Sequence, residues 1–514
     1  MFAAVDIQGA FCAKAVFIKS WLRNFTFTTC HGCGCGQVVR GDPAQIQTRF
    51  DVTIPRVIVR RNAIRKFSST FSVGNCWNTY IATLAFVKRT LSSSLPGRLN
   101  RLSQKTTLFH QHSIMAGDEQ KNIVIIGGGI IGATSAYFLT HHPSYNPEKH
   151  KVILLEATKI AGGASGKAGG LLALWAYPSS IVPLSYKLHK QLADKYGGDE
   201  RWGYRQVHCG SVDCKGRQLT AKDSVKGKDN EMDGKNDRPA DREKNSVSLE
   251  KNPPKVSAKL AARGIPKDLD WVHPDCLRMY DEMGDPSTTS QVHPYQFTTS
   301  MADLAAEKGA DIRVGAAVKS INRTKDGKGV ESVTYEDKND NNKEVTISAT
   351  DVVISAGPWT KTVYPDAPIS ATRAHSVTIR PTREISAYAL FTEIKLPAGF
   401  KKSSREQHVS PEIYTRPKNE VYACGEGDHM VPLPKSSDLV EVDEQRCQDV
   451  VDYVSSISDE LRDGEVTARQ ACYLPNVQGG NGPLIGQTGV KGLLIAAGHT
   501  CWGMLPLYHY ARLY

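Results

Sequence analysis

The sequence predicts a chain of mixed α/β class (α+β overall), in which a Rossmann-like domain assembled from separate segments is joined to an antiparallel-sheet domain. Residues 121–171 have the strand, glycine turn, helix and strand order of a βαβ unit. Residues 369–440 instead carry short alternating runs that are typical of antiparallel strands. A length of 514 residues also exceeds that of one ordinary domain, so two or three domains are expected.

The glycines at the start of the βαβ unit predict a dinucleotide site. An apolar run, Ile123–Ile126, leads into Gly127, Gly129 and Gly132, and a helical stretch follows from Ile130. One glycine makes the tight turn, one lets backbone approach a pyrophosphate, and one lets the helix pack on the strand. The spacing alone is a weak signal, but the strand before it and the helix after it make it strong. A structural βαβ turn without a ligand is the alternative.

Polar residues at the end of the second strand extend this prediction. The run Val152–Leu155 ends in Glu156, where a carboxylate can bind both hydroxyls of an adenosine ribose and disfavour a ribose phosphate. The next turn, AGGASGKAGGLLA, places the Ser165 hydroxyl and the Lys167 ammonium among small residues. This arrangement suits a second phosphate or a flavin edge, and a plain glycine linker is the alternative.

The net charge of +11 does not indicate nucleic-acid binding, because the excess is confined to one end of the chain. Residues 1–114 hold 15 Lys and Arg against three acidic residues, whereas the rest holds 49 basic and 50 acidic residues. The leader resembles a transit peptide in its Arg and Ser content, but its length and Asp6 fit that class poorly. We interpret it as a disordered extension or as a doubtful part of the gene prediction, with Met115 as a natural start.

Cysteine usage points to a reducing compartment and to no metal site. Cys30, Cys33 and Cys35 lie close together, but no second pair follows at zinc spacing. The seven cysteines of the body are scattered, without the spacing of a disulfide framework. No window reaches the roughly 18 apolar residues of a membrane span. We expect a cytoplasmic protein, or a mitochondrial one if the basic leader is genuine.

The chain divides into segments that differ in composition. Residues 215–259 are dense in charged residues and poor in aliphatic ones, which predicts a solvated surface insertion. A helix is expected over residues 178–196, and another from Val442 to Leu461. The expected parts are residues 120–210, 269–360 (with some substrate-domain elements) and 466–503 for the nucleotide domain, 369–465 for the cap domain, and 504–514 for an atypical short tail.

At this point four segments carry a resemblance: ASGKAGGLL, HPYQFT, AGPW and GHTCWG. In this order, from about Asn122 to Gly503, they resemble the FAD-dependent oxidoreductases of the D-amino-acid-oxidase-like family, which includes glycine and sarcosine oxidases. The segments look most similar to uncharacterised fungal members. The resemblance implies FAD as cofactor, a small amine or amino-acid substrate, hydride transfer from a carbon bearing nitrogen to the flavin, and dioxygen as the usual acceptor.

The resemblance also implies roles for individual residues. Three glycines would hold the pyrophosphate, Glu156 the adenosine ribose, and the backbone of Val318 the adenine. The remaining cofactor-binding residues would line the phosphates and the flavin: Ser165, Lys167, Gly170, Leu171, Ala356, Gly357, Trp359 and Gly498. His499 would lie near the ring system. Cys472 is placed like the cysteine that carries covalent flavin in sarcosine-oxidase-like enzymes, with a buried core cysteine as the alternative.

Two departures from the family pattern concern the substrate and the C-terminal end. Many relatives bind a substrate carboxylate with an Arg that precedes a Pro, where this chain has Leu474 and Pro475. Arg469 or Arg416 could substitute for it, although each also suits an ordinary ion pair. After GHTCWG, relatives continue into a helix whose N-terminus faces the flavin, whereas this chain reads MLPLYHYARLY.

Three functions are therefore compatible with the sequence. The preferred one is a flavin-dependent amine or amino-acid oxidoreductase. A catalytically impaired flavin-fold protein in trafficking or scaffolding is the main alternative. An NAD-linked dehydrogenase would share the first βαβ unit but would not require the later motifs. Neither a nucleic-acid partner nor a particular oligomeric state is indicated.

Overall fold

The computed structural model describes residues 120–219, 246–247, 265–480 and 482–506. The basic leader with Cys30, Cys33 and Cys35, most of the charged insertion and residues 507–514 lie outside the described residues. Within these ranges, no helix is both long enough and apolar enough to cross a bilayer.

Segments far apart in sequence form one six-stranded sheet, in the order β20-β21-β13-β1-β2-β9. All neighbours are parallel except β20, which runs antiparallel to β21. The strands are β1 (Lys121–Ile126), β2 (His150–Glu156), β9 (Asp311–Val314), β13 (Asp351–Ile354), β20 (Leu484–Gln487) and β21 (Leu493–Ala497). The central strands are continuous apolar runs because both faces of this sheet are covered.

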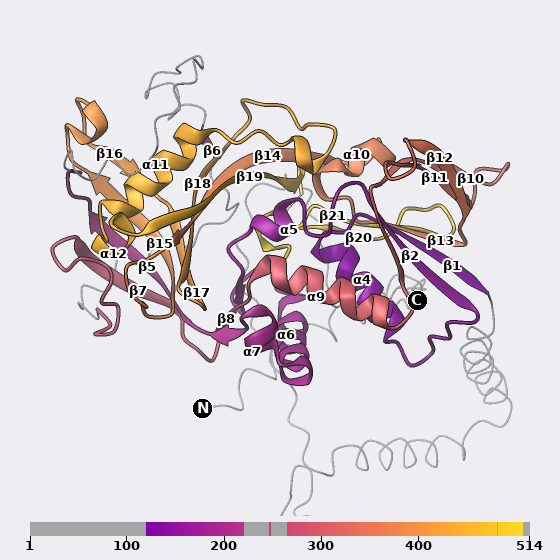
Figure 1. The fold of residues 1–514 in the computed structure, drawn as a ribbon, viewed down its shortest axis with the longest axis horizontal. Coiled ribbons are helices and arrows are strands. Elements are labelled where there is room, and N and C mark those ends of the chain that lie inside the picture. The colour runs from indigo at the N-terminus through magenta and orange to yellow at the C-terminus, as the bar shows by residue number, and fades with distance from the viewer. Residues whose placement is uncertain (1–119, 220–245, 248–264, 481, 507–514) are drawn as a thin grey trace, which may run out of the picture. The chain divides into compact units, whose positions relative to one another are not determined.

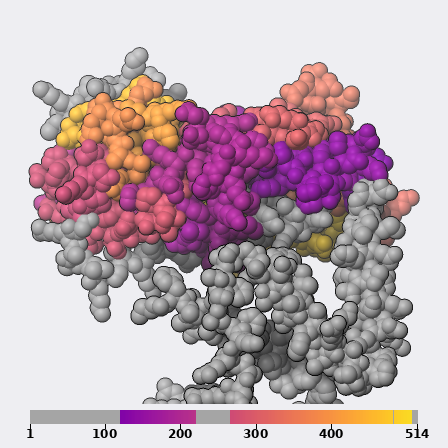
Figure 2. Space-filling model, turned by 90° about the horizontal axis from the view of Figure 1, so that it is seen from below, coloured from indigo at the N-terminus to yellow at the C-terminus, as the bar shows by residue number. Residues whose placement is uncertain are grey.

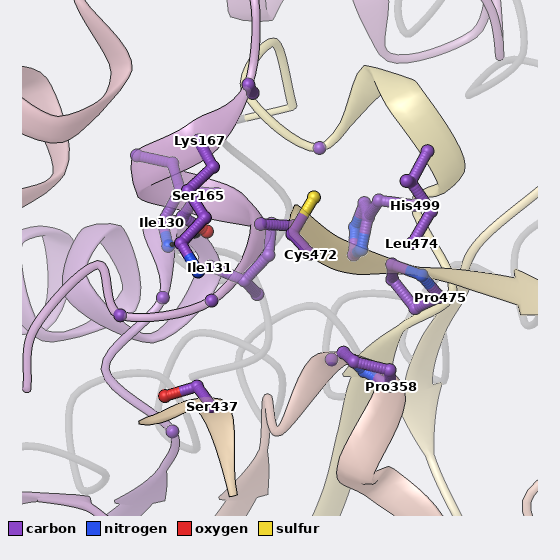
Figure 3. A pocket seen from close by; sticks show the side chains of 18 of the residues that line it. Ile130, Ile131, Ser165, Lys167, Pro358, Ser437, Cys472, Leu474, Pro475 and His499 are labelled. Carbon is purple, nitrogen blue, oxygen red and sulfur yellow. Dashed lines mark hydrogen bonds between the residues drawn. The ribbon is translucent and has the colours of Figure 1, made fainter. Parts of the chain in front are cut away.

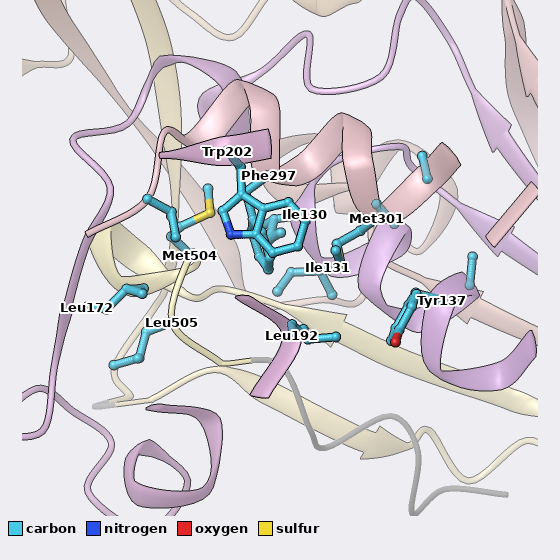
Figure 4. Close-up of a cluster of buried hydrophobic side chains, with 14 of the residues drawn as sticks. Ile130, Ile131, Tyr137, Leu172, Leu192, Trp202, Phe297, Met301, Met504 and Leu505 are labelled. Atoms are coloured by element: carbon cyan, nitrogen blue, oxygen red, sulfur yellow. The ribbon is translucent and has the colours of Figure 1, made fainter. Parts of the chain in front are cut away.

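Helices cover one face of the six-stranded sheet (Figure 1). They are α4 (Ile130–Thr140), α6 (Val182–Tyr196), α7 (Gly198–Trp202) and α9 (Pro294–Glu307). In their shared core the Trp202 and Phe297 rings lie edge to face, with centroids 5.4 Å apart (Figure 4). Met504 and Leu505 are buried in the same cluster, so the chain just after Gly503 is part of the core.

A three-stranded meander covers the other face: β10 (Ala316–Arg323), β11 (Val330–Asp337) and β12 (Lys343–Ser348). Alternation along β1 explains both layers. Ile123 and Ile125 join the helical core, whereas Val124 and Ile126 pack with Val333 of the meander.

The second large element is a nine-stranded sheet with the path β19-β14-β18-β17-β15-β5-β7, to which β16 and β6 add at β15 and β18. Its strands are β5 (His208–Lys215), β6 (Ser246–Val247), β7 (Leu277–Gly284), β14 (Ile369–Arg380), β15 (Tyr388–Leu396), β16 (Gln407–Val409), β17 (Glu412–Arg416), β18 (Glu420–Asp428) and β19 (Glu465–Val477). β19, which we expected in the nucleotide domain, pairs along the whole of β14 instead. The domain boundaries remain a prediction.

The helix expected from Val442 to Leu461 is two helices, α11 (Glu444–Ser455) and α12 (Asp459–Arg462). Ser458 causes the break, because its hydroxyl accepts a hydrogen bond from the Leu461 N–H at 3.3 Å and caps a new helix. Both helices pack on the core of the nine-stranded sheet. In Figure 2 the magenta segment with α6 and α7 lies between the indigo residues of the first crossover and the orange residues of this sheet.

The remaining elements are short. They are α5 (Ala164–Lys167), β3 (Leu171–Ala173), β4 (Arg205–Gln206), β8 (Thr289–Gln291), η3 (Gly357–Trp359), α10 (Thr360–Val363), η4 (Phe400–Lys402), η5 (Ser437–Leu439) and η6 (Thr500–Trp502). Of these, α5, η3 and η6 follow strands and place predicted site residues at one cavity.

Candidate functional site

One cavity of about 280 Å³ extends from the first glycine turn to the nine-stranded sheet. Its walls come from the β1–α4 turn, the end of β2, α5, η3, η6 and strands β14, β15, β17, β18 and β19. Because the carboxyl ends of β1, β2 and β13 open toward it, the cavity occupies the usual ligand position of an open parallel sheet.

The glycine turn leaves no room for side chains. Gly127 has φ +107°, and a Cβ there would lie 2.5 Å from the Ser355 carbonyl oxygen. A Cβ on Gly132 would lie 1.9 Å from the Gly127 carbonyl oxygen, so Gly132 sets the approach of α4 to β1. Gly129 lines the cavity together with Ile130 at the start of α4. Backbone N–H groups at such a helix start favour an anion.

Glu156 is held at the cavity edge by two main-chain N–H donors and one hydroxyl. Its Oε2 accepts a hydrogen bond from Gly128 N–H at 2.7 Å. Its Oε1 accepts from the N–H and the hydroxyl of Thr158 at 2.8 and 2.9 Å. A carboxylate offers about four acceptor positions, so capacity remains for a ribose hydroxyl.

Ser165 and Lys167 connect the second glycine-rich turn to the rest of the site. The Ser165 hydroxyl accepts from Ile130 N–H at 2.9 Å, and Lys167 Nζ donates to the Ala471 carbonyl at 2.8 Å. Burial lowers the pKa of Lys167. Gly170 and Leu171 line the same cavity. We call Gly127, Gly129, Glu156, Ser165 and Lys167 the glycine cradle.

The other predicted cofactor residues reach the cavity from β10 and η3. Val318, Ala356, Gly357 and Trp359 all line it. The Trp359 indole Nε1–H donates to the Pro434 carbonyl at 2.7 Å and so ties down the loop that follows β18. Gly498 has φ +82° and lies between the lining residues Ala497 and His499.

Cys472 and His499 both line the cavity. Figure 3 shows Cys472 between the Ser165 and Lys167 side and the Leu474 and His499 side. The thiol is buried, and burial raises its pKa to about 11 against a smaller opposing effect of Lys167. His499 is also buried and forms a backbone bridge with Asn476 of β19.

Neither arginine considered for a substrate carboxylate lines the cavity. Arg469 Nη2 donates to the Gln448 side chain at 2.5 Å, and Arg469 Nε lies 3.5 Å from Glu444. Arg416 donates to the carbonyl oxygens of Ala168 and Gly169 and pairs with Glu420 at 2.8 Å. Arg416 therefore joins the turn after α5 to the nine-stranded sheet.

Sequence reasoning did not identify the opposite wall, which comes from three adjacent strands. Strand register places Glu412 opposite Phe391 on one side and Cys424 on the other, and Tyr414 opposite Tyr422. These five residues all line the cavity, and we call them the sheet wall. The signal was present in the alternation of β17 and β18, which puts Glu412 with Tyr414, and Tyr422 with Cys424, on one face. The pairing of these strands could not be read from it.

The chain is similar to one protein family and to individual known proteins. Residues 122–514 match the family model described as "FAD dependent oxidoreductase". Two yeast proteins are similar to the chain. "Putative oxidoreductase TDA3" of Saccharomyces cerevisiae is 34% identical over 483 residues, covering 77% of this chain and 91% of that protein. "Putative oxidoreductase C1F5.03c" of Schizosaccharomyces pombe is 32% identical over 397 residues, covering 75% and 90%.

Solved structures share the fold at low identity. Glycine oxidase from Bacillus cereus superposes with a TM-score of 0.52 at 16% identity, covering 77% of this chain and 94% of that one. Iminodiacetate oxidase from Chelativorans superposes with a TM-score of 0.53 at 15% identity, covering 76% and 94%. At these identities the likeness establishes the fold alone.

Proposed function

Since this chain belongs to the family of FAD-dependent oxidoreductases, we propose that it oxidises the C–N bond of a small amine or amino acid, with dioxygen as electron acceptor. The main support for this proposal is that the glycine cradle and the sheet wall line one continuous cavity. Solved structures of the same fold include oxidases named for amine-bearing acids, which supports this choice of bond.

The residues at the cradle fit FAD. The close contacts at Gly127 and Gly132 leave backbone at the position where a pyrophosphate would lie, and Glu156 retains acceptor capacity for the ribose. We propose that Val318 lies at the adenine, while Ala356, Gly357 and Trp359 flank the dinucleotide and Gly498 lies near the ring system. Bound FAD supplies the two-electron redox chemistry, and the protein supplies orientation, exclusion of water and electrostatics.

The net reaction removes two electrons and two protons from the C–N unit and gives an imine, while dioxygen takes them up as hydrogen peroxide. The sheet wall would hold the substrate carbon against the ring system, because it lines the same cavity as the cradle. His499 and Cys472 lie at the cavity and are the side chains proposed to contact the reacting groups. The position of Arg469 outside the cavity gives no support to its expected role in binding a substrate carboxylate at the catalytic site.

The experiment combines spectroscopy with an activity panel. Purified protein is expected to carry FAD, seen in its visible absorbance, and to release hydrogen peroxide with some members of a panel of primary amines, secondary amines and amino acids. Bound FAD without turnover on any member, and without flavin reduction under anaerobic conditions, would instead support the scaffolding alternative. Colourless folded protein that refuses added FAD would overturn the proposed function.

Covalent attachment of FAD through Cys472 is a separate part of the proposal. The position of the sulfur at the cavity supports it, although a thiol with a pKa near 11 is mostly protonated at neutral pH. Acid denaturation tests it. Yellow colour that stays with the precipitated chain, and is absent from Cys472→Ser, would establish the bond; colour found wholly in the supernatant would exclude it.

A further inference from the structure

The sheet wall contains an acidic side chain, that of Glu412, which makes no contact assigned to the glycine cradle. Glu412 lies on β17 between Phe391 and Cys424 of the neighbouring strands, with Tyr414 two residues along the same face. Its Oε2 accepts a hydrogen bond from the Tyr414 hydroxyl and lies 3.8 Å from Cys424 Sγ. Among the described residues, no Lys, Arg or His forms an ion pair with it. The carboxyl is deep in the protein, where burial raises its pKa, but it keeps accessible surface at the cavity. A cation bound beside it would favour its ionised form.

Aromatic rings surround this carboxylate. Tyr414 and Tyr422 stack with centroids 5.8 Å apart, and Phe391 meets Tyr414 edge to face at 6.2 Å. The Arg416 guanidinium already lies over the Tyr422 ring, 4.9 Å from its centroid, so a second cation is compatible with this ring system. A substrate cation placed beside Glu412 would therefore lie among aromatic rings as well as beside a carboxylate. Both groups attract an alkylammonium, and the attraction grows where water is excluded.

The cavity has few cationic side chains that could bind a substrate carboxylate. No arginine occurs among the described residues that line it. Its two lysines are Lys167, whose Nζ donates to the Ala471 carbonyl, and Lys435, which is exposed on the loop after β18. His375, on the sheet side, is neutral at physiological pH, since burial and then Arg373 lower its pKa to about 4. Its Nε2 accepts from the Asp443 N–H at 3.0 Å.

We infer that Glu412 selects the substrate: it binds the ammonium of a cationic amine that has no carboxylate, with Tyr414, Tyr422 and Phe391 around the charge. This inference rests on the proposed function and narrows its substrate class from amines and amino acids to amines. Removing one partner of a buried charge-assisted contact costs roughly a 10- to 100-fold loss in affinity. Glu412 acts here as a specificity residue, distinct from the FAD-binding residues.

The test uses FAD-loaded full-length protein and two matched pairs of probes: ethylamine with alanine, and benzylamine with phenylglycine. Members of a pair differ only in the carboxylate. Binding is measured anaerobically through perturbation of the flavin spectrum and by calorimetry, and turnover is measured separately. Wild type is expected to bind the amine of at least one pair at least about tenfold more tightly than its carboxylate partner, and Glu412→Gln is expected to lose that preference. Glu426→Gln is the matched control, because Glu426 is exposed on β18 and does not line the cavity.

The outcomes separate this inference from the proposed function. Preference for the amino acids, binding of neither pair, or unchanged amine affinity in Glu412→Gln would each overturn the role of Glu412. Amine binding that depends on Glu412 without any turnover would preserve the binding role and count against the oxidase. If Glu412→Gln fails to fold, a wild-type preference for the amino acids still overturns the inference. Glu412→Asp, which keeps the charge but withdraws it by one methylene, then serves as the variant, and unchanged amine affinity in it would also count against Glu412.

Discussion

The glycine cradle and the sheet wall face each other across one cavity but are built in opposite ways. The cradle combines glycine turns with the polar side chains of Glu156, Ser165 and Lys167, and two of its hydrogen bonds are fairly local, joining residues 28 and 35 positions apart (Gly128 to Glu156 and Ile130 to Ser165). The sheet wall is made of large side chains whose neighbours are set by strand register. The cradle therefore admits few substitutions and suits a cofactor common to a family, whereas the wall can change residue by residue and suits a particular substrate.

Adding atoms at the helix turn behind the cradle should produce the largest effect. In Gly132→Val the new Cβ would start 1.9 Å from the Gly127 carbonyl oxygen, so α4 and β1 must separate. We expect loss of bound FAD and a decrease of at least about 3 kcal/mol in the free energy of unfolding. Visible absorbance after gel filtration and chemical denaturation measure the two effects.

Gly482→Ala provides the control, because no described residue lies within 4 Å of a Cβ built there. It should retain FAD and change stability by less than about 0.5 kcal/mol. If Gly132→Val retained FAD, the cradle would accept a large added side chain. The contrast between a cradle that admits few substitutions and a more variable sheet wall would then be wrong.

The contact between the two regions depends on Arg416. In Arg416→Met the carbonyls of Ala168 and Gly169 lose this donor, and Glu420 loses the guanidinium and keeps, among the described residues, only His293, 3.5 Å away. The guanidinium is buried, so we expect the unfolding free energy to fall by about 2–3 kcal/mol, with weaker FAD retention. Arg469→Met is the matched variant, since its partners Gln448 and Glu444 lie away from the cavity, and it should cost less than about 1 kcal/mol.

Chemical denaturation of both variants, together with the dissociation rate of FAD, distinguishes their roles. If Arg469→Met altered substrate binding while Arg416→Met did not alter FAD retention, the assignment of the two arginines would be reversed.

The contrast also explains how far the sequence could predict the site. Glycine spacing and the acid after the second strand are local signals, so Gly127, Gly129 and Glu156 could be named as a group and do lie at one cavity. Glu412 could be assigned to a strand and even to a face, but the identity of its neighbours depends on register with β15 and β18. No local pattern gives that register. The long pairing of β19 with β14 could not be predicted for the same reason, since it is a tertiary contact.

Acid should destabilise the helical layer behind the cradle. His189 is fully buried, and its ring Nε2 donates to the Met504 carbonyl at 3.0 Å; burial lowers its pKa to about 3. The folded pKa lies below the unfolded value of about 6.5, so this stabilising contribution is complete above pH ~6.5 and is lost as pH falls toward ~3. Between pH ~7 and ~5 the unfolding free energy should fall by about 2 kcal/mol through this residue alone.

Denaturant titrations at the two pH values measure this slope. His189→Gln, which keeps a donor to the Met504 carbonyl, should lose that part of the acid sensitivity, whereas the exposed His429→Gln should keep it. If the unfolding free energy fell by the same amount between the two pH values in wild type and in His189→Gln, protonation of the His189 ring would not be coupled to unfolding.

The smallest expected effect concerns the loop that links the two regions at the dinucleotide end. Trp359 donates its indole N–H to the Pro434 carbonyl, and the Ser437 hydroxyl meets the Thr158 hydroxyl at 2.7 Å beside Glu156. Trp359→Phe keeps an aromatic ring at the cavity but removes that donor, which should cost about 1 kcal/mol and speed FAD dissociation by roughly fivefold. Stopped-flow transfer of FAD to an apoflavoprotein acceptor measures the rate. Tyr473→Phe removes one comparable donor on the sheet side of the same loop, a hydroxyl that lies 2.9 Å from the Val431 carbonyl and 3.1 Å from the Pro432 carbonyl. If the loop retains FAD from both of its attachments, the two variants should match; if only Trp359→Phe is faster, retention belongs to the cradle end alone.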